Sequence, residues 1–178
     1  MKITSDQLEA RKLGTPLLFV DDDPIAHIIM KTHLEGWNMI PAYSAEEALD
    51  ILEKRHILIV ITDIGLPGMD GLEFLREVRT TRGIVQVIIV TASSRTDDLI
   101  NAFEAGATDF LLKPLKKEDI EDALENILIK IHRWKTTMKE LFHKKKHLSP
   151  EQVIPFETDN ESRHLSPEQV IPFDGDCD

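Results

Sequence analysis

Five short apolar runs alternate with amphipathic segments between residues 16 and 128. The runs are LLFV (17–20), MIPA (39–42), ILIVIT (57–62), VQVIIVT (85–91) and DFLL (109–112). Four of the five are short, rich in β-branched or aromatic residues and apolar on consecutive positions, which is typical of parallel strands buried on both faces. Five strand–helix pairs in this order predict an α/β fold, an open and doubly wound sheet whose ligands bind beyond the carboxyl ends of its strands.

The segments between the runs carry apolar residues at helical spacing, which predicts four amphipathic helices. Ser44 and Glu47 form a predicted capping box at the start of one of them. Gly36, Gly83 and Gly106 stand where helices are expected to stop. The shared faces are Ile25, Ile28, Ile29 and His33; Ala48, Leu49, Ile51 and Leu52; Leu72, Leu75 and Val78; and Leu99, Ala102 and Phe103.

The last helix is predicted to be unusually long, from about Glu118 to Lys146. Its apolar residues recur at alternating spacings of four and three, which is the a/d pattern of a coiled coil. We call this series the seam; it consists of Ile120, Leu124, Ile127, Ile131, Trp134, Met138 and Leu141. The first half can pack on the sheet. The second half is expected either to be covered by the chain's own tail or to pair with a second copy as a homodimer.

The composition excludes several classes of protein. Thirty-two acidic residues against 21 basic ones give a net charge of −11, which argues against nucleic acid as the main partner. Cys177 is the single cysteine, so an internal disulfide framework or a cysteine zinc site is excluded. The chain has neither a run of 18 apolar residues nor an apolar signal segment at its start. We therefore expect a cytoplasmic protein with no membrane partner.

Charge is distributed unevenly near the C-terminus. Between Lys130 and His147, seven basic residues accompany one acidic residue, whereas from His147 to Asp178 eight acidic residues accompany one basic residue. The sequence HLSPEQVIPF at 147–156 returns unchanged at 164–173. Each copy places Val-Ile-Pro-Phe between acidic residues, so the copies are predicted to dock on two equivalent grooves or on the basic helix. A duplication without function is the alternative.

These patterns divide the chain into four parts. They are a lead segment (1–15), a domain (16–130), a basic helical extension that carries the outer seam (131–147) and an acidic tail with the duplicated motif (148–178). The tail is too short to form an independent DNA-binding or catalytic domain.

Polar side chains stand where the predicted strands end. Because parallel strands end at one edge of a sheet, we expect these side chains to converge there. Clustered carboxylates repel one another unless a cation binds, and hard oxygen ligands suit Mg²⁺. An anion between Mg²⁺ and a lysine, beside a carboxylate nucleophile, describes phosphoryl transfer to an aspartate. The residues are Asp21, Asp22 and Asp23 after the first strand, Asp63 after the third, Thr91 and Ala92 after the fourth, and Lys113 and Pro114 after the fifth.

Four segments at these strand ends resemble the receiver domain of two-component response regulators. They are Asp21-Asp22, the run from Thr62 through Asp63, Pro67 and Asp70 to Gly71, Val90-Thr91-Ala92, and Phe110-Leu-Leu-Lys113-Pro114. The resemblance covers about residues 15–130, with the segments in the family's order. It implies a flavodoxin-like sheet of order 2-1-3-4-5 and a signalling switch. The phosphoryl donor would be a histidine kinase or a phosphotransfer protein.

Carried over to this chain, the resemblance makes Asp63 the phosphorylated nucleophile. It implies that Asp22, Asp63 and the backbone carbonyl of Gly65 hold Mg²⁺, with Asp21 acting through water. By the same resemblance the phosphoryl oxygens are bound by Lys113, Thr91 and Ala92.

The resemblance also implies a conformational switch and a shaped loop. Thr91 would move toward the phosphoryl group, and the Phe110 ring would turn inward into the space that Thr91 vacates. A cis peptide bond is expected before Pro114, and Pro67 and Gly71 would shape the loop after Asp63, with Gly71 opening a helix. Asp23 is interpreted as the cap of a helix that begins at Pro24, and Asp70 as a turn residue without chemistry.

Two other interpretations compete with the phosphorylated receiver. A haloacid-dehalogenase-like phosphatase also combines an aspartate nucleophile with Mg²⁺, and Asp21-x-Asp23 mimics its motif. However, Ile25 stands where that family has Thr or Val, and the segment around Asp63 would be unexplained. A pseudo-receiver that is never phosphorylated is disfavoured because no site residue is missing. We expect a phosphoryl acceptor with self-phosphorylation and self-dephosphorylation chemistry only, rather than an enzyme.

Output and phosphoryl lifetime are further expectations. The chain is predicted either to signal alone through protein contacts, with a dimer as the expected form, or to be part of a larger regulator whose helix is a stalk. The residues two positions after Asp63 and Thr91 are the small Gly65 and Ser93. The lifetime of the phosphoryl group is therefore predicted not to depend on a side chain at Gly65.

Overall fold

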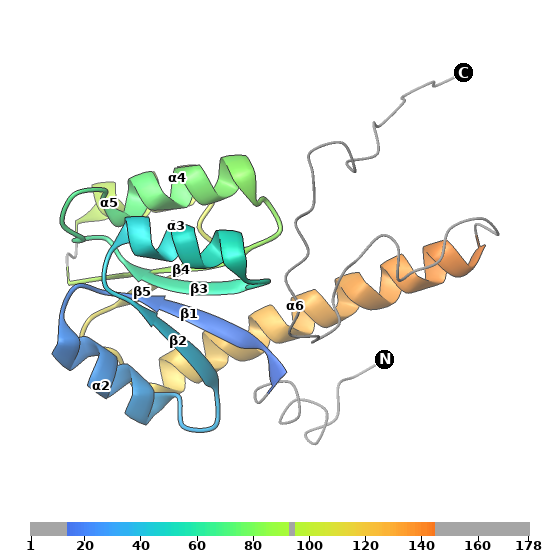
Figure 1. Ribbon diagram of the computed structural model, residues 1–178, viewed down its shortest axis with the longest axis horizontal. Helices are drawn as coiled ribbons and strands as arrows, with labels where there is room; N and C mark the ends of the chain where they lie inside the picture. Colours follow the sequence, from blue (N-terminus) through green and yellow to red (C-terminus); the bar gives the residue numbers. More distant parts are fainter. Residues whose placement is uncertain (1–13, 93–94, 145–178) are drawn as a thin grey trace.

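The computed structural model describes residues 14–92 and 95–144. They form a five-stranded parallel sheet of order β2-β1-β3-β4-β5 with helices on both faces (Figure 1). This confirms the predicted doubly wound, flavodoxin-like fold. The elements are β1 (Pro16–Val20), α2 (Pro24–His33), β2 (Asn38–Ala42), α3 (Ala45–Lys54), β3 (Ile59–Asp63), α4 (Gly71–Thr81), β4 (Gln86–Thr91), α5 (Thr96–Glu104), β5 (Asp109–Leu112) and α6 (Lys117–Lys144).

Successive residues of the central strands point to opposite faces of the sheet, and both faces are covered. One face packs under α2 and α6, and the other under α3, α4 and α5 (Figure 1). The sheet therefore separates two apolar clusters, which explains why the strands are apolar on consecutive positions. On the first face the strand residues are Leu17, Phe19, Ile59, Ile61, Ile88 and Val90; on the second they are Leu18, Val20, Val60, Val87 and Ile89.

Strand register brings the carboxyl ends of the strands to one edge. Val20 is paired with Thr62, and Asp63 with Val90. Thr91 is paired with Leu112. The residues that follow β1, β3, β4 and β5 consequently emerge side by side, as the sequence predicts.

Three helices have a short polar residue as their N-cap. Asp23 accepts a hydrogen bond from the Ile25 N–H at 2.8 Å and caps α2, as predicted. Ser44 accepts from the Glu47 N–H at 3.1 Å, but the Glu47 carboxylate accepts from Tyr43, one residue earlier than in a standard capping box. Asp70, predicted to be a turn residue, is the N-cap of α4 and forms a complete capping box with Glu73.

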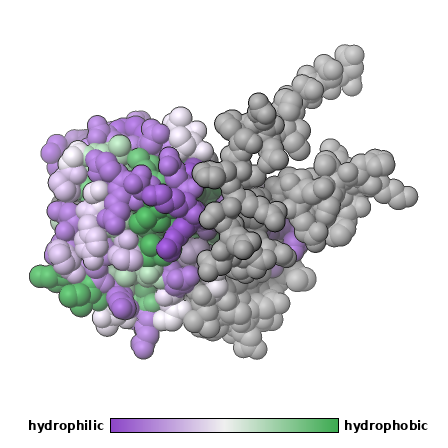
Figure 2. Space-filling model, in the orientation of Figure 1, coloured by the Kyte–Doolittle hydropathy of each residue, from purple (hydrophilic) through white to green (hydrophobic). Residues whose placement is uncertain are grey.

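The apolar face predicted on α2 does not pack on the sheet. Ile28 is 68% exposed on α2, and its neighbours Ile25 and Ile29 are exposed as well. Figure 2 shows hydrophobic surface at the lower left, where Figure 1 places α2. The buried side of this helix carries His27 and Met30 instead, because His27 bonds to the end of β1 and sets the rotation of the helix.

On α5 the core contact is also narrower than predicted. Ala102 is fully buried, whereas Leu99 is half exposed and Phe103 is 79% exposed. The small Ala102 side chain therefore marks where α5 approaches the sheet.

Helix α6 continues past the sheet as one unbroken helix. Its 28 residues correspond to about 42 Å at 1.5 Å per residue. In the first half, the seam residues Ile120, Leu124 and Ile127 are buried against the sheet. In the second half, Trp134 is 49% and Leu141 is 52% exposed, and this half projects beyond the sheet (Figure 1).

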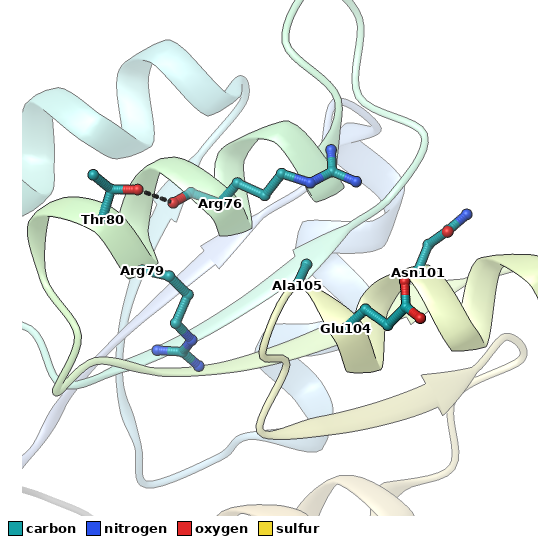
Figure 3. Close-up of a pocket in the computed structure, with 6 residues that line it drawn as sticks. All are labelled: Arg76, Arg79, Thr80, Asn101, Glu104 and Ala105. Carbon is teal, nitrogen blue, oxygen red and sulfur yellow. Dashed lines mark hydrogen bonds between the residues drawn. The ribbon is translucent and has the colours of Figure 1, made fainter.

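Arg79 ties the far end of α4 to the opposite edge of the sheet. Its guanidinium donates to the carbonyl of Gly106 at 2.7 Å, to the carbonyl of Val85 and to the hydroxyl of Thr108 at 3.2 Å. A hollow of about 380 Å³ lies beside it between α4 and α5 (Figure 3). The side chains that line this hollow are Arg76, Arg79, Thr80, Asn101, Glu104 and Ala105. Because its guanidinium group already makes these three hydrogen bonds, we assign Arg79 a structural role rather than a ligand-binding one.

Among the helices of residues 14–92 and 95–144, none combines the length and the apolar composition needed to cross a membrane.

Gly71 is predicted to be essential for the packing of α4 behind β3. A Cβ atom at this position would lie 2.0 Å from the carbonyl oxygen of Asp63, so Gly71→Ala would force the helix away from the strand. We expect Gly71→Ala to lower the free energy of unfolding by about 2 kcal/mol or more, measured by urea denaturation. Gly83→Ala is the matched control, since its nearest neighbour would lie 3.8 Å away. Equal stability of the two variants would contradict this packing.

Candidate functional site

Three carboxylates meet at the edge formed by the ends of β1 and β3. Asp21 and Asp22 follow β1, and Asp63 is the last residue of β3. One oxygen from each of the three lies within 4.8 Å of the others. Asp21 is 1% exposed, Asp63 is partly buried and Asp22 faces solvent, so the cluster is open on one side. The sequence predicted all three members of this cluster.

Lys113 joins two of these carboxylates. Its Nζ atom lies 2.9 Å from Oδ2 of Asp21 and 3.1 Å from Oδ2 of Asp63. Burial by itself lowers the pKa of Lys113, but hydrogen bonds and charge attraction from Asp21 and Asp63 together raise it above its usual value. A group with a raised folded pKa stabilises the fold at lower pH and loses that contribution only as the pH rises through the folded value. Lys113 is therefore cationic throughout the neutral range.

Backbone geometry holds Lys113 in this position. Its N–H donates to the carbonyl of Thr91 at 2.8 Å, which ties the loop after β5 to the end of β4. The Lys113–Pro114 peptide bond is cis, as the sequence predicts. Lys113, which directly follows β5, is thus also hydrogen-bonded to the end of β4.

The Asp21 carboxylate is restrained from a second side. Its Oδ1 atom accepts the N–H of Asp23 at 3.0 Å, while its backbone carbonyl lies 2.8 Å from Nε2 of His27. Because a carbonyl only accepts, Nε2 of His27 is the protonated nitrogen. The His27 ring packs edge-on against Phe19 and tilted against Tyr43, at centroid distances of 4.9 Å and 4.3 Å.

The role of His27 was only partly predicted from the sequence. His27 has no partner at metal-ligand spacing, which predicts a surface or packing residue, and its burial confirms the packing role. The hydrogen bond between His27 and the backbone carbonyl of Asp21 was not predicted, because it depends on the conformation of the turn between β1 and α2.

The loop after Asp63 is closely shaped around the site. Gly65 is exposed, and a Cβ atom there would lie 3.7 Å from Oδ2 of Asp63. Gly71 opens α4, as predicted, and its N–H donates to the carbonyl of Ile64 at 2.9 Å. Pro67 is exposed in the same loop.

Glu46, at the start of α3, supports this loop from outside. Its carboxylate accepts from the Met69 N–H at 3.3 Å. Hydrogen bonds from its own backbone, from Ser44 and from Met69 lower the pKa of the Glu46 carboxyl. Gly68, the residue before Met69, has a positive φ of 79°, which favours glycine.

The remaining predicted site residues lie on β4 and β5. Thr91 is buried at the end of β4, and Ala92 is exposed directly after it. Phe110 on β5 is paired with Ile89 and packs partly buried against the apolar cluster beneath α3, α4 and α5. The structure therefore places Thr91 at the end of β4, the strand next to β3 and Asp63, and Phe110 on the following strand, at the surface of the core.

The charge balance of the cluster suits a divalent cation. Three carboxylates and one ammonium group leave a local charge of −2 (three negative, one positive). Carboxylate and carbonyl oxygens with access to water are the ligands that Mg²⁺ prefers. Asp21, Asp22 and Asp63 therefore fit such an ion, which would replace repulsion between carboxylates with attraction.

Comparison with known proteins agrees with this geometry. Residues 17–125 match the response regulator receiver domain family. The chain belongs to this family. The matched range begins in β1 and ends within α6, so it contains β2 to β5, nearly all of β1, the carboxylate cluster and Lys113. The resemblance found in the sequence is thereby confirmed.

Two curated relatives share sequence with this chain over the receiver domain. The transcriptional regulatory proteins ZraR of Salmonella typhimurium and MalR of Bacillus subtilis are 33% and 36% identical over 114 residues. The alignments cover 63% and 62% of this chain, but only 26% and 48% of those proteins. The chain thus spans about a quarter to a half of these curated relatives.

Solved structures match the receiver domain over nearly their whole length. A CheY-like receiver domain protein from Methanospirillum hungatei has a TM-score of 0.63 at 26% identity, covering 67% of this chain and 97% of that one. A putative response regulator from Chloroflexus aurantiacus has a TM-score of 0.62 at 33% identity, covering 65% and 98%.

We predict that Asp22→Asn weakens Mg²⁺ binding to the receiver domain by roughly tenfold or more, because one charged ligand is lost. Isothermal titration calorimetry with MgCl₂ measures the affinity. Asp23→Asn is the matched control: Asp23 is adjacent, lies outside the carboxylate cluster, and an asparagine still caps α2. Unchanged Mg²⁺ affinity in Asp22→Asn, or an equal loss in the control, would contradict the assigned ligand set.

Proposed function

We propose that this receiver domain is a phosphorylation-dependent switch that accepts a phosphoryl group on Asp63 from a histidine kinase or a phosphotransfer protein. The observation that carries the proposal is the Lys113 ammonium group, 3.1 Å from Asp63 and 2.9 Å from Asp21. A cation held beside one carboxylate of an open acidic cluster supplies charge where a phosphoryl group would sit. The family match supports the same function.

In the proposed reaction, an oxygen of the Asp63 carboxylate attacks phosphorus and forms an acyl phosphate. The bond between phosphorus and the donor's nitrogen breaks, and its electron pair stays on the donor imidazole. The Lys113 ammonium group stabilises the negative charge on the phosphoryl oxygens as they approach. Little covalent chemistry is asked of the protein, so position and charge supply the catalysis.

A bound Mg²⁺ ion would neutralise charge on the phosphoryl oxygens. Asp21, Asp22, Asp63 and the backbone carbonyl of Gly65 are the groups proposed to hold it. The carboxylate cluster supports this set, and Asp21 is kept in place by Lys113 and by the Asp23 N–H.

Thr91 and Phe110 are proposed to transmit the change. Thr91 ends β4 beside the site, and its carbonyl already binds the loop that carries Lys113. Phe110 lies partly buried one strand away, on β5. A shift of the Thr91 hydroxyl toward the phosphoryl oxygens, which Lys113 and the Ala92 backbone would also bind, would open space for the Phe110 ring.

Output is proposed to occur through contacts with other proteins, and the chain to act as a phosphoryl acceptor rather than as an enzyme with a separate substrate. A homodimer through α6 is one such contact. The relatives are described as transcriptional regulators, so the expectation that nucleic acid is not the main partner stays a prediction.

The decisive experiment is the intact mass of the full chain after incubation with acetyl phosphate and MgCl₂. We expect the wild type to gain one phosphoryl group, and the gain to disappear with EDTA and in Asp63→Asn. Asp50→Asn, which changes an exposed carboxylate on α3, should be phosphorylated like the wild type. If neither acetyl phosphate nor a phosphorylated histidine donor modifies the wild type, the pseudo-receiver interpretation replaces this proposal.

A second prediction concerns the lifetime of the phosphoryl group. The Cβ atom of a side chain at position 65 would lie 3.7 Å from Oδ2 of Asp63, so the amide of an asparagine there would be close enough to orient an attacking water molecule. We expect Gly65→Asn to accelerate loss of the phosphoryl group by roughly threefold to tenfold, which is up to ~1.4 kcal/mol in the barrier. Phosphate release after removal of the donor measures the rate, with Gly65→Ala as the control. An unchanged rate in Gly65→Asn would refute this role for position 65.

A further inference from the structure

The outer half of α6 carries an apolar strip that continues beyond the core. The strip consists of Ile131, Trp134, Met138 and Leu141, which follow the buried seam residues at the same heptad spacing. Ile131 still packs, partly buried, against the apolar cluster beneath α2 and α6, and Met138 is also partly buried. Trp134 and Leu141 are each about half exposed, at 49% and 52%. Exposed aromatic and aliphatic side chains that share one face of a helix form a candidate docking surface.

Lysines stand on both sides of this strip. Lys130 directly precedes Ile131, and Lys135 directly follows Trp134, so they occupy the g and e positions beside the a/d seam. From Lys130 to Leu141 the helix has four basic residues and a single acidic one, Glu140. The apolar strip is therefore bordered by positive charge.

This charge pattern makes a second copy a poorer occupant of the strip than an acidic segment. In a parallel coiled coil, the g position of one helix faces the following e position of the other, where charge pairs set partner choice. Lys130 of one copy would face Lys135 of its partner, and like charges in this arrangement destabilise a dimer. An acidic occupant with apolar residues would match both the strip and its borders.

The chain itself contains such an occupant. The tail that begins directly after α6 has eight acidic residues against one basic residue from His147 to Asp178, a net charge of −7. It carries Val-Ile-Pro-Phe twice, at 153–156 and 170–173. The central proline disfavours a long helix, so each copy suits an extended segment lying along a helix rather than a second coiled-coil helix.

The lengths allow the tail to return along α6. Trp134 lies ten residues before Lys144, which is about 15 Å along the helix axis. Val153 lies nine positions after Lys144, and an extended chain of that length spans up to about 30 Å. The first copy can therefore reach Trp134, and the second copy has a longer tether.

We propose that the acidic tail binds the apolar strip of α6 in the same chain, with a Val-Ile-Pro-Phe segment on Trp134 and Met138 and tail carboxylates beside Lys130 and Lys135. Because the tether is short, the local concentration of tail at the strip is high, and two identical copies compete for it. The docked tail withholds the strip from a second copy and from other partners, and thus acts as a built-in competitor of dimerisation.

The proposal is tested on the full chain with Trp134 as the probe. Acrylamide quenching of its fluorescence, together with its indole N–H signal in NMR spectra, reports cover of the strip; Trp37 is 9% exposed and adds little quenching. The test variant carries Ile154→Asp and Ile171→Asp, which place a charge in both copies. We expect the quenching constant of Trp134 to rise about twofold and the indole signal to move. The variant with Ile154→Val and Ile171→Val is the matched control and should behave like the wild type.

Charge reversal on the helix tests the other half of the contact. Lys130→Glu combined with Lys135→Glu should expose Trp134 as the tail variant does, and Lys31→Glu on α2 is the control. Raising NaCl to about 1 M, where charges are screened beyond roughly 3 Å, should weaken the contact in the wild type.

Sedimentation velocity over a range of protein concentrations distinguishes the tail from a second copy. A wild-type monomer whose Trp134 becomes accessible when the tail is altered supports the proposal. Two results overturn it: a Trp134 signal that is unchanged by the tail variant, or a wild-type dimer in which Trp134 is protected regardless of the tail. Because these measurements need no phosphorylation, their failure is independent of the role proposed for Asp63.

Discussion

The arrangement of this receiver domain depends on the balance of charge at one edge of its sheet. Parallel pairing of β1 with β3 brings Asp21, Asp22 and Asp63 together, and crowded carboxylates repel one another. The Lys113 ammonium group offsets part of that repulsion by contacting two of them. The negative charge that Lys113 leaves uncompensated would attract a cation. The same electrostatic constraint therefore shapes the native site and suits it to the cation and the phosphoryl group that are proposed to bind there.

Stability and chemistry are concentrated at opposite edges of the same sheet. At the carboxyl edge, polar groups are held by backbone contacts such as the Lys113 N–H to Thr91 and the Gly71 N–H to Ile64. At the other edge, Arg79 joins α4 to the segments that precede β4 and β5. Two apolar clusters lie between these edges. Interiors of this kind are closely packed and resist local distortion, which supports the proposed transmission of a displacement at the site through the strands.

Helix α6 belongs to two environments. Its first half completes the core, where Ile120, Leu124 and Ile127 are buried, and its second half carries the same apolar series beyond the sheet. Apolar periodicity alone does not say what binds the exposed strip, because a second copy of α6 and the acidic tail would bury the same residues. The lysines beside the strip supply the missing specificity, since charge complementarity discriminates between partners that hydrophobic burial treats alike.

The sequence by itself determined the strands, most helix ends and the members of the site, because each rests on a local signal: an apolar run, a cap such as Asp23, or the glycine at Gly71. It did not determine which side of α2 faces the core, since Ile28 and its neighbours form as good an apolar face as His27 and Met30. Nor did it determine the contacts of Lys113 with Asp21 and Asp63, 92 and 50 residues away along the chain. Such contacts are decided only by the tertiary structure, because strand register and helix rotation set the distances between residues that no local pattern connects.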